Sequence, residues 1–195
     1  IQKSSERMGM LIDDLLNLSR VSRYDMRREQ VNLSALAGEV LAQLREHTPD
    51  RSVACTIQPG ITAEGDGHLL RIVFENLIGN AWKYTARQDN PEIFFGRADD
   101  ADPRAPAHER RRPIFCVRDN GVGFDMAYID KLFTPFQRLH AEKDFPGTGI
   151  GLALVKRIVE SRGGKVGLDS KEGAGATFTF TWPDAPPPPV PARLP

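Results

Sequence analysis

Two glycine-rich runs constrain the fold of this chain more than any other feature. The first, Asp119–Phe124, reads DNGVGF, and the second, Gly147–Leu152, reads GTGIGL. Glycine has no Cβ, so a turn with alternating glycines lets the backbone approach a ligand closely. The second run leads into an apolar segment, Leu152–Val159, that has the pattern of a helix. Amides at a helix start favour an anion such as phosphate, although an isolated glycine-rich turn is more often only a turn.

A third segment, upstream of both runs, has the pattern of an amphipathic helix with a polar stripe. Apolar residues recur at helical spacing from Leu69 to Trp82, so one side of this helix is expected to be buried. Asn76, Asn80 and Lys83 are spaced i, i+4 and i+7 and share one stripe of the surface. Two amides and an ammonium can hold a hydrated Mg²⁺ and a polyphosphate, because Mg²⁺ takes oxygen ligands and keeps water. A solvated helix face is the alternative for this segment alone.

Together the three segments resemble the ATP-binding domain of sensor histidine kinases, a branch of the GHKL ATPase superfamily. Five motifs of that family occur in the family's order between Asn32 and Trp182. They are the N box at 76–85, the G1 box at 119–124, the F box at 133–136, the G2 box at 147–152 and a G3-like turn at 173–178. Five ordered motifs are far more specific than one glycine-rich turn.

The resemblance implies an α/β two-layer sandwich of the Bergerat type, in which a mixed, mostly antiparallel sheet carries helices on one face. ATP and Mg²⁺ would lie between the N-box helix and the glycine loops. Asp119 would accept a hydrogen bond from the adenine amino group, whereas the carbonyl of guanine would be unfavourable there. Asn80 would ligate Mg²⁺, Asn76 would assist at metal or phosphate, and Lys83 would neutralise phosphate charge. The expected nucleotide-binding residues are Asn76, Asn80, Lys83, Tyr84, Asp119, Gly121, Gly123, Phe124, Gly147, Thr148, Gly149, Ile150, Gly151, Leu152 and Thr177.

One position separates branches of the superfamily. Gyrase-like and chaperone-like relatives place a glutamate four residues before the Mg²⁺ asparagine, where it activates water. This chain has Asn76 there, and an amide cannot serve as a general base. Glu75 is adjacent but turned about 100° away on an ideal helix. We therefore expect slow hydrolysis and transfer of the γ-phosphoryl to a histidine, which relays it to a response regulator receiver domain.

By the same resemblance, the chain divides into residues 1–24, an ATP-binding domain at 25–183 and a tail at 184–195. In the first part apolar residues alternate three and four apart, which predicts a long amphipathic helix over about 2–23. It is expected to be the second helix of the hairpin through which the family forms homodimers and accepts phosphate. The proline-rich tail is expected to be a linker or spacer, with a PxxP ligand as the alternative.

None of the chain's four histidines is expected to accept phosphate. The family's acceptor is followed by an acidic residue on a helix, and that helix would precede Ile1. His108-Glu109 has this dipeptide, but it lies among prolines that exclude a long helix. We therefore expect a fragment, beginning with Ile rather than Met, that binds ATP and lacks its own phosphorylation site, so no residue is assigned as catalytic.

The remaining pattern predicts the other elements of an α/β domain. Asn32 or Ser34 is expected to cap a helix at about 35–46, and Asp66 the N-box helix. Residues 137–147 are expected to form the ATP lid. Residues 98–112 are expected to form an exposed, solvated loop, with a partner-binding loop as the alternative. A short helix is predicted at 128–133, and strands are predicted at 53–58, 61–64, 92–97, 114–118, 165–170 and 177–182.

The charge balance argues against two classes of partner. The chain has 26 basic and 26 acidic residues, so no overall field favours nucleic acid or an anionic membrane surface. No apolar stretch is long enough to cross a bilayer. Cys55 and Cys116 lie in predicted strands without partner histidines, which indicates buried free thiols. The expected location is cytoplasmic, and a membrane anchor in a longer parent protein stays open.

Two other functions are compatible with parts of this pattern. An anti-sigma-type serine kinase shares the ATP fold, but it has no need of the amphipathic helix near the N-terminus. A nucleotide-binding interaction module without phosphotransfer would fit the absent histidine, but the intact motifs argue against it.

Overall fold

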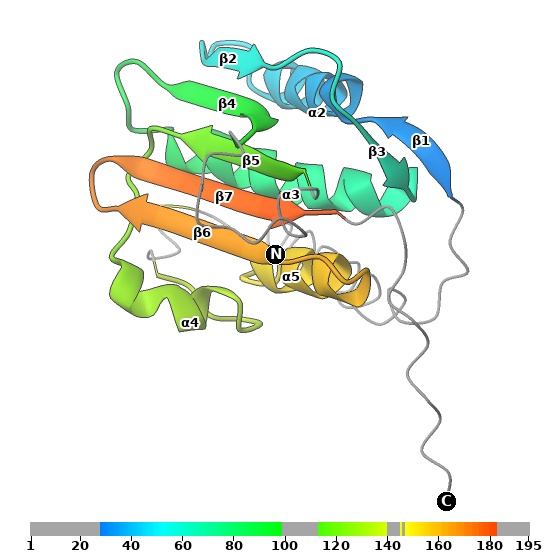
Figure 1. Ribbon diagram of the computed structural model, residues 1–195. Coiled ribbons are helices and arrows are strands. Elements are labelled where there is room, and N and C mark those ends of the chain that lie inside the picture. The colour runs from blue at the N-terminus through cyan, green and yellow to red at the C-terminus, as the bar shows by residue number, and fades with distance from the viewer. Residues whose placement is uncertain (1–27, 99–112, 140–144, 146, 183–195) are drawn as a thin grey trace, which may run out of the picture.

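The computed structural model describes residues 28–98, 113–139, 145 and 147–182. Within them a five-stranded sheet carries helices on one face, and a small two-stranded sheet lies at one end (Figure 1). This arrangement confirms the predicted α/β sandwich. The predicted N-terminal helix, nearly all of the 98–112 loop and the proline-rich tail fall outside the described residues. None of the described helices has the length and apolar character that a membrane span requires.

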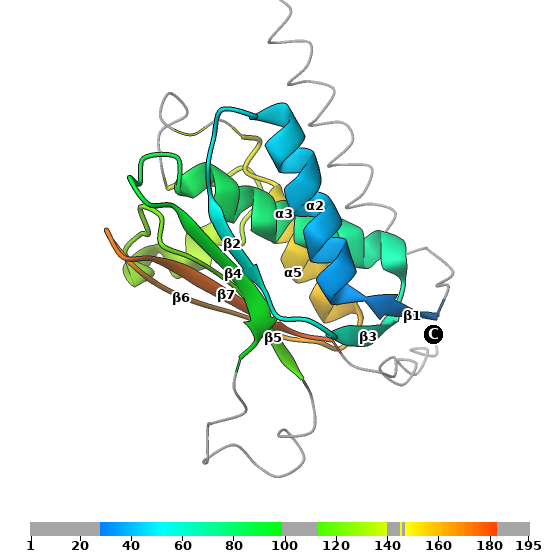
Figure 2. The ribbon, with the colours of Figure 1, turned by 90° about the horizontal axis from the view of Figure 1, so that it is seen from above.

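Three helices lie along one face of the main sheet, as Figure 2 shows. They are α2 (Leu33–His47), α3 (Gly67–Tyr84) and α5 (Gly151–Ser161). Asn32 caps the first by accepting the N–H of Ala35 at 2.9 Å, which selects Asn32 over Ser34. Asp66 caps the second by accepting the amides of His68 and Leu69. The predicted helix at 128–133 is a 3₁₀ turn, η1 (Met126–Tyr128), followed by one helical turn, α4 (Ile129–Leu132).

The main sheet has the strand order β2-β4-β5-β7-β6. Its first two strands are parallel and all other neighbours are antiparallel, which confirms the mixed, mostly antiparallel sheet. The strands are β2 (Ala54–Ile57), β4 (Glu92–Arg97), β5 (Ile114–Asp119), β7 (Gly175–Thr181) and β6 (Val166–Lys171). Cys55 and Cys116 are free thiols, the second buried and the first half-buried.

The two-stranded sheet was only half predicted. Strand β3 (Thr62–Gly65) matches the expected strand at 61–64, but its antiparallel partner β1 (Glu29–Asn32) was missed. Three of the four β1 residues are exposed, so the strand lacks the alternation that reveals a buried face. Trp182, directly after β7, ties this sheet to the domain by donating from Nε1 to the carbonyl of Glu64 at 3.1 Å.

An aromatic cluster holds α3 against the middle of the sheet. The ring of Phe74 lies edge-on to Phe95, at 4.9 Å between centroids, and to Phe180, at 6.2 Å. Phe115 packs on Phe180 at 5.3 Å, and all four rings are buried. Because α3 is fixed at its middle, its C-terminal turns lie beside the end of β5, where Asp119 is located.

The same substitution is expected to have opposite effects at two glycines. A Cβ on Gly65 would lie 2.5 Å from Nε1 of the buried Trp182, so Gly65→Ala is expected to destabilise the protein by about 1–3 kcal/mol. A Cβ on Gly79, inside α3, would meet nothing within 4 Å, so Gly79→Ala should stabilise it by about 0.5–1 kcal/mol. Urea unfolding of both variants measures this, and a shift of the same sign would contradict the packing described.

Candidate functional site

A cavity of about 350 Å³ lies between the C-terminal half of α3, the ends of β5 and β7, and the segment that precedes α5. It brings together most of the residues predicted from sequence. The residues that line it are Asn76, Asn80, Lys83, Tyr84, Asp119, Gly123, Phe124, Leu132, Gln137, Arg138, Leu139, Gly147, Thr148, Gly149, Gly151, Leu152, Ala176 and Phe178. The predicted residues Gly121, Ile150 and Thr177 are outside this lining.

Asp119 is a buried acid that lines the cavity. It ends β5, and its Oδ1 accepts the N–H of Gly121 at 2.8 Å. Burial raises the pKa of Asp119 to about 6, although hydrogen bonds from the backbone of Gly121 and Ala176 oppose the shift. A carboxylate held this way has acceptor capacity left and is expensive to leave unpaired, so it favours a ligand that donates a hydrogen bond.

The glycines after Asp119 are required by packing as well as by any ligand. A Cβ on Gly123, at φ 58°, would lie 2.1 Å from the carbonyl oxygen of Lys171. A Cβ on Gly121 would lie 2.7 Å from the carbonyl oxygen of Tyr84. Gly121 therefore supports the turn from behind, which is why it does not line the cavity.

The polar stripe of α3 faces the cavity as predicted. Asn76, Asn80 and Lys83 all line it. Asn76 donates from Nδ2 to the carbonyl of Ile72 at 2.8 Å, and its Oδ1 lies against the start of α5, only 2.1 Å from where a Cβ on Gly151 would be. Glycine at that position thus lets the helix start approach Asn76.

Two cations line the cavity close to each other. Burial, helped by the nearby Arg138, lowers the pKa of Lys83 to about 8. Arg138 donates from Nη1 to the carbonyl of Gly147 at 3.0 Å and from Nη2 to the carbonyl of Phe145. The ring of Phe145 is buried and packs on Tyr84 at 5.0 Å between centroids. Two half-buried cations this close together indicate a site for an anion.

Arg138 was not among the predicted site residues. It follows the F box in a segment of mixed charge without periodicity. In such a segment the sequence does not indicate whether an arginine side chain points into a cavity or into solvent. Gln137 and Leu139 were missed for the same reason, and Leu132 belongs to the one-turn α4.

The second glycine run forms the loop that enters α5. Gly149 has φ 77°, and its carbonyl accepts the N–H of Phe136 at 2.9 Å. A Cβ there would be 3.2 Å from the carbonyl oxygen of Gln137, so the loop is closely stacked on the F box. Ile150 is buried beneath it, packing into the protein rather than facing the cavity.

Thr177 does not line the cavity. Successive side chains of a strand point to opposite faces. Ala176 pairs in register with Asp119, and it lines the cavity together with Phe178. Thr177 lies between them in β7, beside Arg118, on the other face of the sheet. Only the register between β5 and β7 could have revealed this, and the sequence does not give it.

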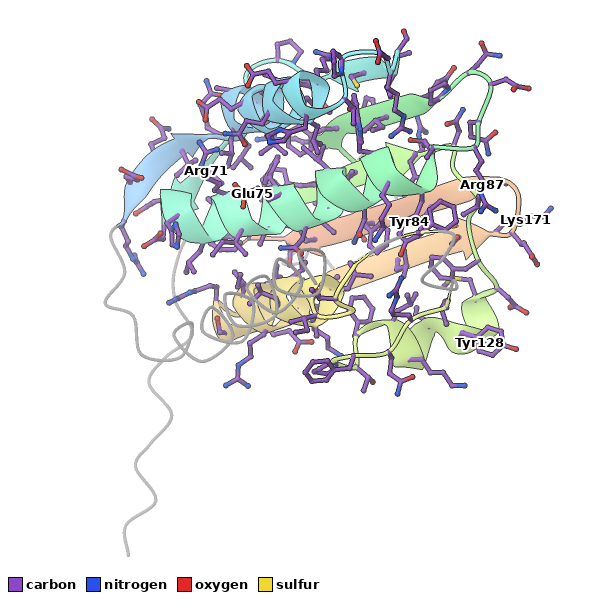
Figure 3. All side chains as sticks on the ribbon, turned by 180° about the vertical axis from the view of Figure 1, so that it is seen from behind. Arg71, Glu75, Tyr84, Arg87, Tyr128 and Lys171 are labelled. Atoms are coloured by element: carbon purple, nitrogen blue, oxygen red, sulfur yellow. The ribbon has the colours of Figure 1, made fainter. Side chains whose placement is uncertain are left out.

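Asp119 is the only carboxylate among the described residues that line the cavity. Glu75 is exposed on α3 and outside the lining; Figure 3 shows it near Arg71, away from Tyr84 at the helix end. The described residues also contain no cluster of His, Cys, Asp or Glu that could hold a metal by itself. The oxygen donors available for a metal are the amides of Asn76 and Asn80, which fit a hard cation that brings other oxygen ligands with it.

Curated proteins similar to the chain are longer than it is. Cyanobacterial phytochrome A of Nostoc sp. is 34% identical over 176 residues, which are 90% of this chain and 22% of that protein. The sensor protein kinase WalK of Staphylococcus aureus is 28% identical over 192 residues, which are 93% of this chain and 29% of that protein. The chain thus spans less than a third of the length of these relatives.

Solved structures share the fold. Full-length ShkA in complex with AMPPNP superposes with a TM-score of 0.72 at 25% identity, covering 95% of this chain and 37% of that one. The catalytic domain of histidine kinase ThkA gives a TM-score of 0.62 at 23% identity, covering 83% of this chain and 98% of that one.

A family profile described as "Histidine kinase-, DNA gyrase B-, and HSP90-like ATPase" matches residues 65–186, which contain α3, both glycine runs and the whole cavity. The chain therefore belongs to the family of histidine kinase-, DNA gyrase B- and HSP90-like ATPases.

Proposed function

We propose that this chain is the catalytic part of a sensor histidine kinase, which transfers the γ-phosphoryl of Mg-ATP to a histidine on a helical hairpin. One observation carries the proposal. The described residues that line a single cavity include one acceptor carboxylate, two cations and two amides, and among them is no second carboxylate that could activate water. Such a site would hydrolyse ATP slowly. A histidine kinase requires this, because the nucleotide must stay intact until the acceptor histidine reaches it.

The Asp119 end would bind adenine. The base amino group would donate to the carboxylate, and the ring would lie against Gly123, which also lines the cavity. Ala176 and Phe178 supply apolar walls, so the ring would lose little by leaving water. Guanine would place a carbonyl against the carboxylate, which disfavours it.

The opposite end would bind the triphosphate. Lys83 and Arg138 would neutralise its charge, and the amides from Gly147 to Gly151 would donate to its oxygens. Asn80, with Asn76 beside it, would hold Mg²⁺ through an amide oxygen. The bound Mg²⁺ would supply charge neutralisation at the transferring phosphoryl group. The chain's own residues would hold the nucleotide in one orientation, with its γ-phosphoryl group accessible to the histidine.

The partners follow from the same proposal. Residues 1–24 would be the second helix of the phosphotransfer hairpin of a homodimer, and 184–195 a linker. A receiver domain would take the phosphoryl group from the histidine. The kinase would act in the cytoplasm, where ATP is available.

Asp119→Asn is expected to weaken ATP binding and to stabilise the empty protein. The amide presents a donor to the base amino group, so affinity should fall at least about tenfold. Folding raises the pKa of Asp119 from 3.8 to about 6, so stability is lost as pH rises through this window, by up to about 3 kcal/mol at pH 7. The variant removes that loss. Calorimetry with ATP and thermal unfolding at pH 7 measure both effects.

Asp89→Asn is the matched control, since Asp89 is exposed and outside the cavity. Neither ATP affinity nor the melting temperature should change in it. An Asp119→Asn variant that binds ATP as the wild type does would remove Asp119 from the base-binding role.

The affinity for ATP is expected to have a bell-shaped pH dependence. Below about pH 6 Asp119 becomes protonated and loses an acceptor, and above about pH 8 the free protein loses the Lys83 charge. Asp119→Asn should flatten the acidic limb and Lys83→Met the alkaline limb. Protonation of ATP itself is common to all three proteins, so an unchanged acidic limb in Asp119→Asn would contradict the assignment.

Phosphotransfer tests the proposed function directly. The chain is mixed with radiolabelled Mg-ATP and a separate helical hairpin from the parent protein, and label should appear on the hairpin histidine. Asn80→Ala should reduce the rate by at least about a hundredfold, because the metal-bound phosphates lose their position. Label that appears on serine, or ATP binding without transfer to the hairpin, would refute the proposal.

A further inference from the structure

Arg51 contacts the last turn of α3 from the loop that precedes β2. Its Nη1 donates to the carbonyl of Trp82, and its Nη2 donates to the hydroxyl of Thr85 at 2.9 Å. The guanidinium also lies over the Trp82 ring, 4.9 Å from the centroid. Arg51 does not line the cavity. This side chain therefore acts on the helix end and not on any ligand.

The contact completes the hydrogen bonding of the helix end. The last four carbonyls of a helix have no partner within it and must find one elsewhere. The carbonyl of Ala81 accepts the amide of Thr85 at 3.2 Å and its hydroxyl at 2.7 Å, and that of Lys83 accepts the amide of Ala86 at 3.2 Å. The carbonyl of Tyr84 accepts the amide of Val122 at 3.2 Å.

The carbonyl of Trp82 depends on Arg51. The hydroxyl of Thr85 lies 3.1 Å from this carbonyl but 2.7 Å from that of Ala81, and it has one proton to donate. By donating to the Thr85 oxygen, Arg51 also leaves that proton directed at Ala81. One planar guanidinium thus fixes two neighbouring acceptors at once, which suits arginine and not lysine.

This helix turn is shared by both ends of the site. It carries the side chain of Lys83 at the cationic end. Its Tyr84 carbonyl holds Val122, in the turn that follows Asp119, and the carbonyl of Val122 in turn accepts the amide of Gly173 at 2.7 Å. A displacement of the turn would therefore change the spacing between Lys83 and Asp119.

We propose that Arg51 is a positioning residue for nucleotide binding, which holds the carbonyl of Trp82 and the hydroxyl of Thr85 so that the phosphate end and the base end of the cavity keep their spacing. The proposal rests on the proposed function, because the ligand it concerns is Mg-ATP.

The test compares Arg51→Ala and Arg51→Lys with the wild-type chain. Calorimetry with Mg-ATP, at a temperature where each protein is folded, should show about tenfold weaker binding for the alanine variant. The lysine variant should lie between, since an ammonium can hold one of the two acceptors. Arg71→Ala is the matched control, because Arg71 pairs with Glu39 at the other half of the same helix, and it should bind Mg-ATP as the wild type does.

Amide hydrogen exchange separates positioning from general stability. In Arg51→Ala the amide of Val122 should exchange at least about tenfold faster, while that of the core residue Phe180 stays unchanged. If Arg51→Ala does not fold, the same two measurements on Arg51→Lys decide the matter.

The inference about Arg51 would be overturned if the variants bound Mg-ATP as the wild type does, or if exchange accelerated equally at Val122 and Phe180. Neither result would affect the proposed function. A wild-type chain that fails to bind Mg-ATP would instead overturn the proposed function.

Discussion

The packing of α3 across the centre of the sheet determines the geometry of the whole site. Phe74 is enclosed by Phe95 and Phe180, so the helix can neither slide nor rotate without opening the core. The polar stripe of α3 and the carboxyl group at the end of β5 come from segments more than thirty residues apart, yet they meet across one cavity. The core thereby fixes the distance between these two parts of the site.

The charged groups of the site lower the stability of the folded protein. Asp119 and Lys83 are both charged groups removed from water, and burial shifts the pKa of each toward its neutral form. Both side chains line the cavity, and no hydrogen bond or ion pair joins these two described residues. A ligand that donates at one end and carries negative charge at the other relieves both costs together, so binding and stability are coupled.

Much of this site could be predicted from sequence, because helical periodicity places Asn76, Asn80 and Lys83 on one stripe whatever the tertiary context. The glycine runs could also be recognised in the sequence. Glycine is required at Gly123 and Gly151 because close packing leaves no room for a Cβ. Tertiary register could not be predicted in the same way. The pleat of β7 directs Ala176 and Phe178 into the cavity and places Thr177 between them on the other face.

Other features leave no local mark in the sequence. Arg138 is a single cation in an irregular segment, and the direction of its side chain depends on two carbonyls that only the fold supplies. Strand β1 was missed because its residues are mostly exposed and its partner is thirty residues away. Sequence periodicity indicates which side of a helix or strand is buried. It does not indicate which distant elements pair, and Arg138 and β1 depend on such pairing.

The contact between Trp182 and Glu64 also has a mechanical consequence. It joins the end of β7 to the small sheet that contains β1, so the chain enters and leaves the described domain at one end (Figure 1). The cavity lies beside the opposite end of α3. The contact therefore holds the first and last strands of the described domain together on the side away from the cavity.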